Sequence, residues 1–189
     1  MHPMLNIAVR AARVAGSIIV RGFENRDDLV KQVKGANDYV TQIDKEAEMA
    51  IIHKIKQSYP EHSFLGEESG ETVGESTEFQ WIIDPLDGTT NFIKGIPHFA
   101  VSIALLHKGR LDQGVVFDPI RGELFTASRG QGAQLNGYRI RASKARDLSE
   151  TVLATGLPFK NKTQYADYAI RLNKIFHDCG DIRRAGSAA

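Results

Sequence analysis

Apolar side chains recur at every third or fourth position in two stretches of the first 60 residues. In residues 3–23 they follow the i, i+3/i+4, i+7 rule, which predicts an amphipathic helix. A second stretch of this kind begins after Thr41, a candidate N-cap with Asp44 three residues on, and Pro60 is expected to stop it. The polar stretch 24–40 between them is expected to be a loop. The apolar faces consist of Leu5, Ala8, Val9, Ala12, Gly16, Ile19 and Phe23, and of Ile43, Ala47, Ala50, Ile51 and Ile55.

Beyond residue 60 the pattern changes to short apolar runs bounded by turn residues. The runs at 63–69 and 81–85 stop at acidic residues. Four more candidate strands follow from Phe99, separated by Gly-, Asp-Pro- and Asn-Gly-type turns, which is typical of an antiparallel meander. The remaining predicted elements are a strand at 151–159, a helix at 163–178, and a strand, a tight turn and the first turn of a helix within 181–189. This order predicts a layered α+β or α/β fold with a mixed sheet.

Composition narrows the class of protein without changing this picture. With 189 residues, 42% hydrophobic and 25% charged, the chain is typical of one globular domain, and a net charge of +1 provides no whole-molecule field for nucleic acid or membrane. The single cysteine, Cys179, excludes an internal disulfide and a cysteine-based zinc site. Three arginines interrupt the N-terminal apolar pattern, so neither a signal peptide nor a spanning helix is expected. We therefore expect a cytoplasmic protein that does not associate with membranes.

Charge is unevenly distributed along the chain. Residues 61–78 carry six glutamates and no lysine or arginine, whereas residues 139–184 carry ten Lys/Arg against five Asp/Glu. One interpretation is two solvated faces of opposite sign. The other is an acidic metal-binding region and a basic surface for a partner.

The stretch WIIDPLDGTTNF, residues 81–92, carries the strongest chemical signal. Asp84 and Asp87 follow an apolar run, and a proline between them bends the chain so that both carboxylates can converge. Two close carboxylates repel each other unless a counter-charge is present. A hard divalent cation provides that charge and prefers oxygen ligands. Because no two histidines lie at zinc-ligand spacing, magnesium is the natural candidate.

Small residues directly after the second aspartate suggest an anion site. Gly88, Thr89, Thr90 and Asn91 supply unhindered backbone N–H groups and two hydroxyls. If this segment opens a helix, those N–H groups can bind a phosphate. Metal ligands and an anion site within seven residues indicate metal-assisted phosphoester chemistry. The alternative is a polar turn after a strand.

Other carboxylates have weaker signals for the same site. Glu67 ends a short apolar run, and adjacent or parallel strands would bring it beside the two aspartates, where it could ligate the metal and orient a water with the help of Thr89. For Glu68 we favour a solvated position. For Asp44, interaction with the dipole of its helix, worth roughly 0.3–1 kcal/mol, is a sufficient explanation without any function.

These residues carry a resemblance to a known family. GEES at 66–69 and WIIDPLDGTTNF together resemble the inositol monophosphatases, the magnesium-dependent, lithium-sensitive phosphatases, and the likeness to SuhB-type bacterial members extends to Ala189. The resemblance implies a layered αβαβα sandwich of the inositol monophosphatase and fructose-1,6-bisphosphatase type, a homodimer, and hydrolysis of inositol 1-phosphate. It also implies two or three Mg²⁺ ions and inhibition by Li⁺.

The resemblance further assigns roles by matching position. Glu67, Asp84 and the carbonyl of Leu86 would hold one Mg²⁺, and Asp84 and Asp87 a second. Glu67 and Thr89 would activate the attacking water, with Asp44 supporting Thr89. The phosphate and substrate would contact Asp87, Gly88, Thr89, Thr90, Gly186, Ser187 and Ala188.

One departure concerns the end of the chain. The family continues to a Trp-Asp motif whose aspartate is another ligand of the second metal, whereas the only tryptophan here is Trp81. Residues 1–189 are therefore expected to form a single, incomplete phosphatase domain that exposes apolar surface, and the activity of a chain of this length is an open question.

Three competing functions stay open at this point. The first is an aspartyl-nucleophile phosphatase, in which a carboxylate is phosphorylated covalently. Enzymes of that class carry the motif D-x-D-G-T, whereas the spacing here is D-x-x-D. A sugar bisphosphate or a sulfated nucleotide could replace inositol phosphate as the substrate. SuhB-type members also resemble proteins that bind transcription antitermination factors or RNA polymerase, and the basic 139–184 region could be such a surface.

Overall fold

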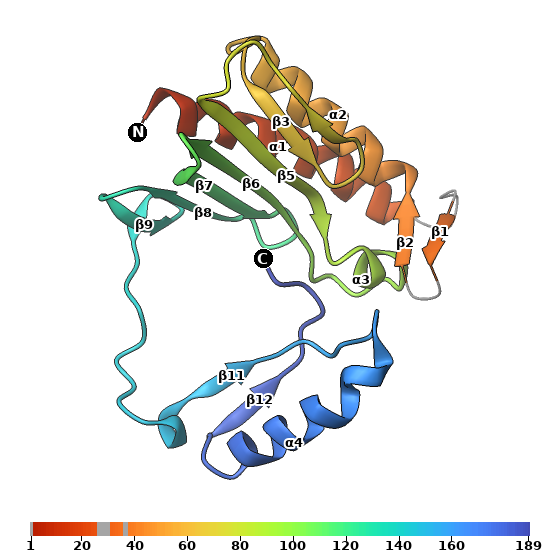
Figure 1. The fold of residues 1–189 in the computed structure, drawn as a ribbon, viewed down its shortest axis with the longest axis vertical. Helices are drawn as coiled ribbons and strands as arrows, with labels where there is room; N and C mark the ends of the chain where they lie inside the picture. Colours follow the sequence, from red (N-terminus) through yellow and green to blue (C-terminus); the bar gives the residue numbers. More distant parts are fainter. Residues whose placement is uncertain (1, 26–30, 36–37) are drawn as a thin grey trace.

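The computed structural model describes residues 2–25, 31–35 and 38–189, and between 31 and 41 it describes only the backbone. Figure 1 shows two helices lying along one large twisted sheet, and a smaller unit of two strands and a helix. An extended segment joins the end of the sheet to this smaller unit. The last residues run back from it toward the sheet.

Helices α1 (Pro3–Glu24) and α2 (Gln42–Lys56) form as the apolar periodicity predicts. They pack against each other, α1 also against β6 and β7 and α2 against β5. Helix α2 ends at Lys56, so the expectation that Pro60 stops it was wrong: the Tyr59 amide still donates to the Ile55 carbonyl in a closing turn. The side chain of Thr41, the predicted N-cap, lies outside the described residues.

By length and composition α1 could cross a membrane, contrary to the expectation based on its arginines. Most of its apolar residues, however, face the core, and several of them are completely inaccessible to solvent. Burial against α2 and the sheet accounts for the apolar character of this helix. The fully buried positions include Ala11, Ala12, Ala15 and Ile19.

The expected loop at 24–40 was wrong in part. Strands β1 (Lys31–Gly35) and β2 (Asp38–Thr41) pair antiparallel there, and β2 leads directly into α2. Residues 36–37, within the expected loop, lie outside the described residues. Polar composition suggested a loop because the segment lacks the alternation of a half-buried strand.

In the described part of the chain, one mixed sheet has the strand order β10-β9-β8-β7-β6-β5-β3-β4. The four strands of the predicted meander, β6 to β9, pair antiparallel, and β5 and β10 extend it in the same sense. Strand β3 pairs parallel with β5. One face is buried under α1 and α2, and the other is half-exposed, so burial alternates along the strands. The strands are β3 (Ser63–Gly66), β4 (Gly70–Thr72), β5 (Phe79–Asp87), β6 (Ala100–His107), β7 (Arg110–Asp118), β8 (Glu123–Ser128), β9 (Gly132–Leu135) and β10 (Tyr138–Arg139).

The smaller unit differs in detail from the sequence-based prediction. The predicted strand at 151–159 is only β11 (Val152–Ala154), which pairs parallel with β12 (Asp181–Arg183). Helix α4 (Tyr165–Phe176) connects them, and none of its residues, all of them described, is buried. The first turn of a helix expected near 189 does not form in the described structure. A short 3-10 turn, η2 (Leu148–Glu150), precedes β11, and another, η3 (Lys162–Gln164), precedes α4.

Apolar surface is exposed on this smaller unit, as the sequence led us to expect. Ile170 is 58% exposed and Phe176 is 59% exposed, although both lie on a helix with an apolar stripe. A stripe of this kind is normally covered by another layer. Such a surface also leads us to predict poor solubility or altered association of the chain.

A ring of aromatic side chains surrounds a buried histidine at the far end of β5. The Trp81 indole N–H donates to Nδ1 of His62 at 3.0 Å, and both side chains are at most 2% exposed. His62 stacks between Tyr59 and Phe79, with ring centroids 4.8 and 4.7 Å away. Burial lowers the pKa of His62, against a smaller opposing effect of Glu61. The histidine therefore serves as a neutral acceptor in the core.

This arrangement predicts that stability falls in mild acid. Because the pKa of His62 is lower in the folded than in the unfolded protein, the unfolded chain binds the extra proton first. The free energy of unfolding should therefore decrease as the pH falls below about 6.5, the ordinary histidine value, toward the lowered one. Urea unfolding at a series of pH values, followed by the fluorescence of Trp81, measures it.

Two histidine variants separate this effect from general acid sensitivity. His62→Gln should lose part of the pH dependence below 6.5, whereas His53→Gln, at an exposed position on α2, should keep it. An unchanged pH dependence in His62→Gln would contradict the assignment.

Candidate active site

A one-residue bulge in β5 brings the two aspartates to one face of the sheet. Asp84 pairs with Ser102 and Asp87 with Ala100, so three steps along β5 oppose two along β6. In a regular strand residues three apart point to opposite faces, but the extra residue restores the same side. Both aspartates are partly exposed, whereas Pro85 and Leu86 between them are buried. The sequence-based expectation of convergence is thus met by a bulge rather than by a simple bend.

Glu67 reaches the same place from the neighbouring strand. The parallel pairing of β3 with β5 sets Gly66 opposite Ile83, and the Glu67 amide donates to the Ile83 carbonyl at 3.0 Å. Burial, the charges of Glu67 and Asp87, and a hydrogen bond with Glu67 raise the pKa of Asp84 to about 8. Three carboxylates therefore crowd one end of β5, as the sequence predicted.

Gly88 and the short helix α3 (Thr89–Ile93) follow directly. Gly88 caps this helix with φ 97°, in the left-handed region that favours glycine. The amides of a helix's first turn point out of the helix and can receive an anion. The Thr89 hydroxyl donates to the Leu86 carbonyl at 3.1 Å, which ties the turn to the bulge. The condition stated for an anion site, that this segment opens a helix, is met.

The last residues of the chain close against this turn. Oδ2 of Asp87 accepts hydrogen bonds from Ser187 Oγ at 2.7 Å and from the Ala189 amide at 2.6 Å, and also from the Ala188 amide. Buried Asn91 donates to the carbonyls of His98 at 2.7 Å and Ala185 at 2.9 Å. The segment 185–189 is therefore fixed beside the carboxylates, where the resemblance placed it.

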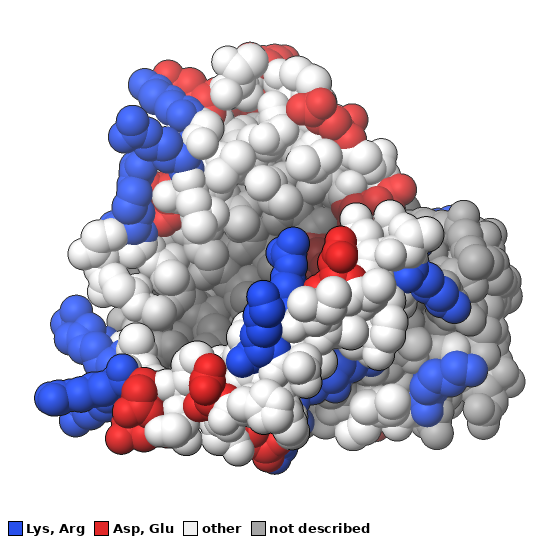
Figure 2. Space-filling view, turned by 60° about the horizontal axis from the view of Figure 1, so that its bottom comes forward, with Lys and Arg blue, Asp and Glu red and all other residues white. Residues whose placement is uncertain are grey.

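A cavity of about 500 Å³ contains these groups. One wall comes from β5, Glu67 and α3, and the other from residues 154–160 and 184–188 of the smaller unit. Figure 2 shows a hollow in this face of the molecule, with basic and acidic side chains side by side at its edge. Of the predicted site residues, the lining includes Glu67, Asp84, Leu86, Asp87, Gly88, Thr89, Thr90, Gly186, Ser187 and Ala188.

Asp44 is the predicted residue that lies outside the described lining of this cavity. It is 3% exposed and lies in the first turn of α2. Its burial argues against a purely solvated role at the helix N-terminus. Its support of Thr89 stays a prediction.

Sequence reasoning missed several residues of the site. Lys160 and Arg184 line the cavity and bring positive charge to it. The position of Lys160 had no local signal, because more than 70 residues separate it from Asp84. Asn91 was noted only as part of a polar run, although its amide bridges two segments. Glu48, a buried acid on α2, was overlooked because one polar residue on an otherwise apolar face resembles ordinary helix composition.

The donor set agrees in chemistry with a hard cation. Asp84, Glu67 and the Leu86 carbonyl present oxygen only. The raised pKa of Asp84 reflects its burial first, and then the like charges of Glu67 and Asp87. In the described part of the chain, however, no three His, Cys, Asp or Glu side chains are grouped closely enough to hold a metal ion as they lie. Asp87 is turned toward Ser187 instead. The oxygen ligands of these residues therefore suit Mg²⁺. In this structure, however, the Asp87 carboxylate accepts hydrogen bonds from Ser187 and Ala189.

The comparisons with known proteins agree with this site. Residues 1–189 match the model of the inositol monophosphatase family. This chain belongs to that family. A curated relative named Nus factor SuhB, from Escherichia coli strain K12, is 60% identical over 189 residues, which are all of this chain and 71% of that protein.

Solved structures of the family share the fold. The extragenic suppressor protein suhB from Bartonella henselae superposes with a TM-score of 0.97 at 44% identity, over 100% of this chain and 72% of that one. An IMPase from Thermotoga maritima gives a TM-score of 0.84 at 33% identity, covering 98% of this chain and 69% of that one. The predicted αβαβα sandwich of the inositol monophosphatase and fructose-1,6-bisphosphatase type is thus confirmed.

The conformation of Gly88 predicts a measurable cost of substitution. In Gly88→Ala the new Cβ would lie 3.0 Å from the His98 carbonyl oxygen and 3.2 Å from Cβ of Ser187, at a positive φ. We expect a loss of more than about 1–2 kcal/mol in the free energy of unfolding. Chemical denaturation measures it.

Gly122→Ala is the matched control for this substitution. Gly122 has φ 66°, but a Cβ added there would meet nothing within 4 Å. It also has a positive φ, closer to the values that other residues can adopt, and no crowding, so its cost should be smaller. Equal losses for the two variants would show that the close approach of His98 and Ser187 has no energetic weight.

Proposed function

We propose that this chain hydrolyses inositol 1-phosphate to inositol and phosphate in a Mg²⁺-dependent reaction. The observation that carries the proposal is the convergence of Glu67, Asp84 and Asp87 beside the first turn of α3 in one cavity. Carboxylates for a hard cation and amides for an anion are the parts that phosphate-ester hydrolysis requires. Family membership and the name of the Thermotoga maritima relative support this substrate class.

The proposal gives each group a role. Glu67, Asp84 and the Leu86 carbonyl would hold one Mg²⁺, and Asp84 with Asp87 a second. Bound Mg²⁺ supplies Lewis-acid polarisation of the phosphate and a lower pKa for water. Glu67 can accept the proton of the attacking water. The Thr89 hydroxyl can orient that water once the hydroxyl gives up its hydrogen bond to the Leu86 carbonyl.

The substrate would be held at both ends. The amides of Gly88 to Thr90 face the phosphate position, and Lys160 and Arg184 add positive charge on the opposite wall. Gly186, Ser187 and Ala188 would lie against the polyol. The homodimer, the inhibition by Li⁺ and the number of Mg²⁺ ions stay predictions.

The proposal predicts that phosphate release depends on both Mg²⁺ and the aspartates. Asp84→Asn and Asp87→Asn should each lower the rate by more than about a hundredfold, since metal ligands matter at least as much as their supporting residues. Asp112→Asn, which affects an ion pair with Arg129 and a hydrogen bond from Gln113 on the β7–β8 hairpin, should retain activity. The assay measures phosphate from inositol 1-phosphate while Mg²⁺ is titrated from zero.

Two further arms distinguish the competing enzymes. Hydrolysis in ¹⁸O-labelled water should place the label directly in phosphate, whereas a trapped phosphoenzyme would indicate an aspartyl nucleophile. A sugar bisphosphate and a sulfated nucleotide, tested in parallel, measure the breadth of the substrate range. Preference for either over inositol 1-phosphate would overturn the substrate assignment.

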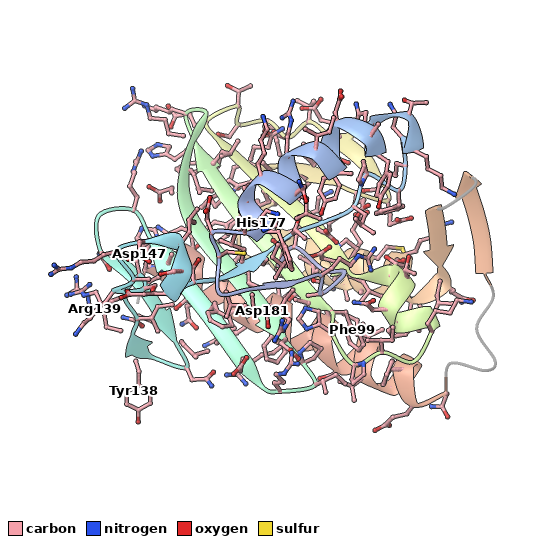
Figure 3. The ribbon with its side chains drawn as sticks, turned by 90° about the horizontal axis from the view of Figure 1, so that it is seen from below. Phe99, Tyr138, Arg139, Asp147, His177 and Asp181 are labelled. Atoms are coloured by element: carbon pink, nitrogen blue, oxygen red, sulfur yellow. The ribbon has the colours of Figure 1, made fainter. Side chains whose placement is uncertain are left out.

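A second candidate function is binding to the transcription machinery, and the names of the relatives favour it. Curated relatives from several bacteria are named Nus factor SuhB. The chain carries exposed basic residues at the end of the last sheet strand and directly after it, Arg139, Arg141, Lys144 and Arg146. Figure 3 shows Arg139 at the edge of the molecule, near Tyr138 and remote from Phe99 beside α3. The basic segment is therefore a surface separate from the carboxylates.

Binding and catalysis should respond to different substitutions if both functions exist. Arg141→Glu should weaken capture of RNA polymerase or a Nus factor and leave phosphate release unchanged, while Asp87→Asn should do the reverse. Arg110→Glu, at an exposed position on β7, controls for the charge change. Loss of both functions in Asp87→Asn would argue against an independent binding surface.

A further inference from the structure

Glu48 is a buried carboxylate that holds the turn next to it. Its side chain is 2% exposed and lies on α2, one helical turn after Asp44. One carboxylate oxygen accepts the Glu68 amide at 2.9 Å and the other accepts the Ser69 amide at 2.8 Å. Hydrogen bonds from backbone amides to a carboxylate are about twice as strong as neutral ones. Both oxygens therefore hold the turn between β3 and β4.

The held turn is the one that presents Glu67. The Glu67 amide is itself fixed to the Ile83 carbonyl of β5, one residue before Asp84. The amides of three consecutive residues, 67 to 69, thus have defined partners on two different elements. Gly66 fits against Glu48 so closely that a Cβ there would collide with the carboxylate. The turn is clamped between α2 and β5.

A hairpin turn at the surface does not need such a clamp. Water satisfies exposed turn amides without cost, whereas burying a carboxylate requires full compensation by hydrogen bonds. Glu67 is an exposed side chain that leaves this turn toward Asp84 and the cavity. Fixing its backbone from both sides limits the positions that its carboxylate can reach. The buried acid therefore has its effect on the orientation of Glu67.

We propose that Glu48 is a positioning residue that acts through the 66–69 turn to hold the Glu67 carboxylate where it can bind Mg²⁺ with Asp84. The inference rests on the proposed function, because it assigns Glu48 a role in the same site. Groups that orient metal ligands without touching the metal typically change metal affinity or activity by about 10–100-fold. Glu48 would then belong to the site although it lies outside the described cavity lining.

Two substitutions separate geometry from charge. Glu48→Gln keeps the length of the side chain but turns an amide donor toward one of the backbone N–H groups. Glu48→Asp keeps the charge but is one methylene too short to reach both amides. If position is what matters, both variants should raise the Mg²⁺ concentration needed for half-maximal effect by about 10–100-fold.

The matched control is another carboxylate that clamps a turn. Oδ1 of Asp118 accepts the amides of Ile120 at 2.8 Å and Arg121 at 2.9 Å in the β7–β8 hairpin. Asp118→Asn takes the charge from similar hydrogen bonds, and from the ion pair with Arg121, away from Glu67. It should lower the melting temperature without changing the response to Mg²⁺.

Three measurements on the full chain provide the test. The melting temperature is followed while Mg²⁺ alone is titrated, phosphate release is followed over the same range, and deuterium uptake is measured in the 66–70 peptide. We expect both Glu48 variants to exchange faster in that peptide and to require more Mg²⁺ in the other two assays. The Asp118 variant should match the wild type in all three except for its lower melting temperature.

The alternative outcomes overturn the proposal in distinguishable ways. A lower melting temperature with an unchanged Mg²⁺ response would make Glu48 a structural residue only. A shifted response in Glu48→Gln but not in Glu48→Asp would assign the effect to charge rather than position. If the wild type neither responds to Mg²⁺ nor releases phosphate, the proposed function fails and the role of Glu48 toward the metal fails with it.

Discussion

The parallel pairing of β3 with β5 is the constraint on which the site depends. In the described sheet the other strand pairs run antiparallel, so the C-terminal ends of two neighbouring strands point in opposite directions. Only a parallel pair places the C-terminal ends of two adjacent strands side by side. Glu67 leaves β3 there and Asp84 approaches the end of β5 beside it. The helix α2 between the β1–β2 hairpin and β3 precedes this arrangement and supplies the buried acids behind it.

The bulge in β5 and the glycine after it convert this proximity into a site. Without the extra residue, Asp87 would face the helices and meet the apolar core, where a carboxylate is costly. With it, Leu86 fills the core, its carbonyl meets Thr89, and Asp87 remains on the open face. The left-handed conformation of Gly88 then turns the chain into α3 within one residue. The bulge and the left-handed glycine therefore determine where the carboxylates and the first turn of α3 lie.

Those parts of the fold and the site that depend on local pattern could be predicted from the sequence. The 3.6-residue periodicity located α1 and α2, and the three carboxylates at the end of β5 were found because they end apolar runs. The β1–β2 pair could not be predicted, because its sequence is polar and lacks alternation, and the ends of α2 and β11 were wrong because tertiary contacts set such boundaries. Lys160 and Arg184 reach the cavity only through the arrangement of the smaller unit. The importance of Glu48 depends on where two backbone amides of a distant turn point.

The two walls of the cavity differ greatly in how firmly they are built. The wall formed by β5 and α3 rests on the aromatic and aliphatic core, including Phe92, Phe99 and Leu86. The opposite wall, apart from the segment 185–189 that Asp87 and Asn91 hold, belongs to a unit whose strands and helix contain no buried residue, all of them being described. Regions with so little burial open locally at a small fraction of the global unfolding free energy. A ligand would thus enter between a rigid face and a yielding one, and binding it would order the yielding face.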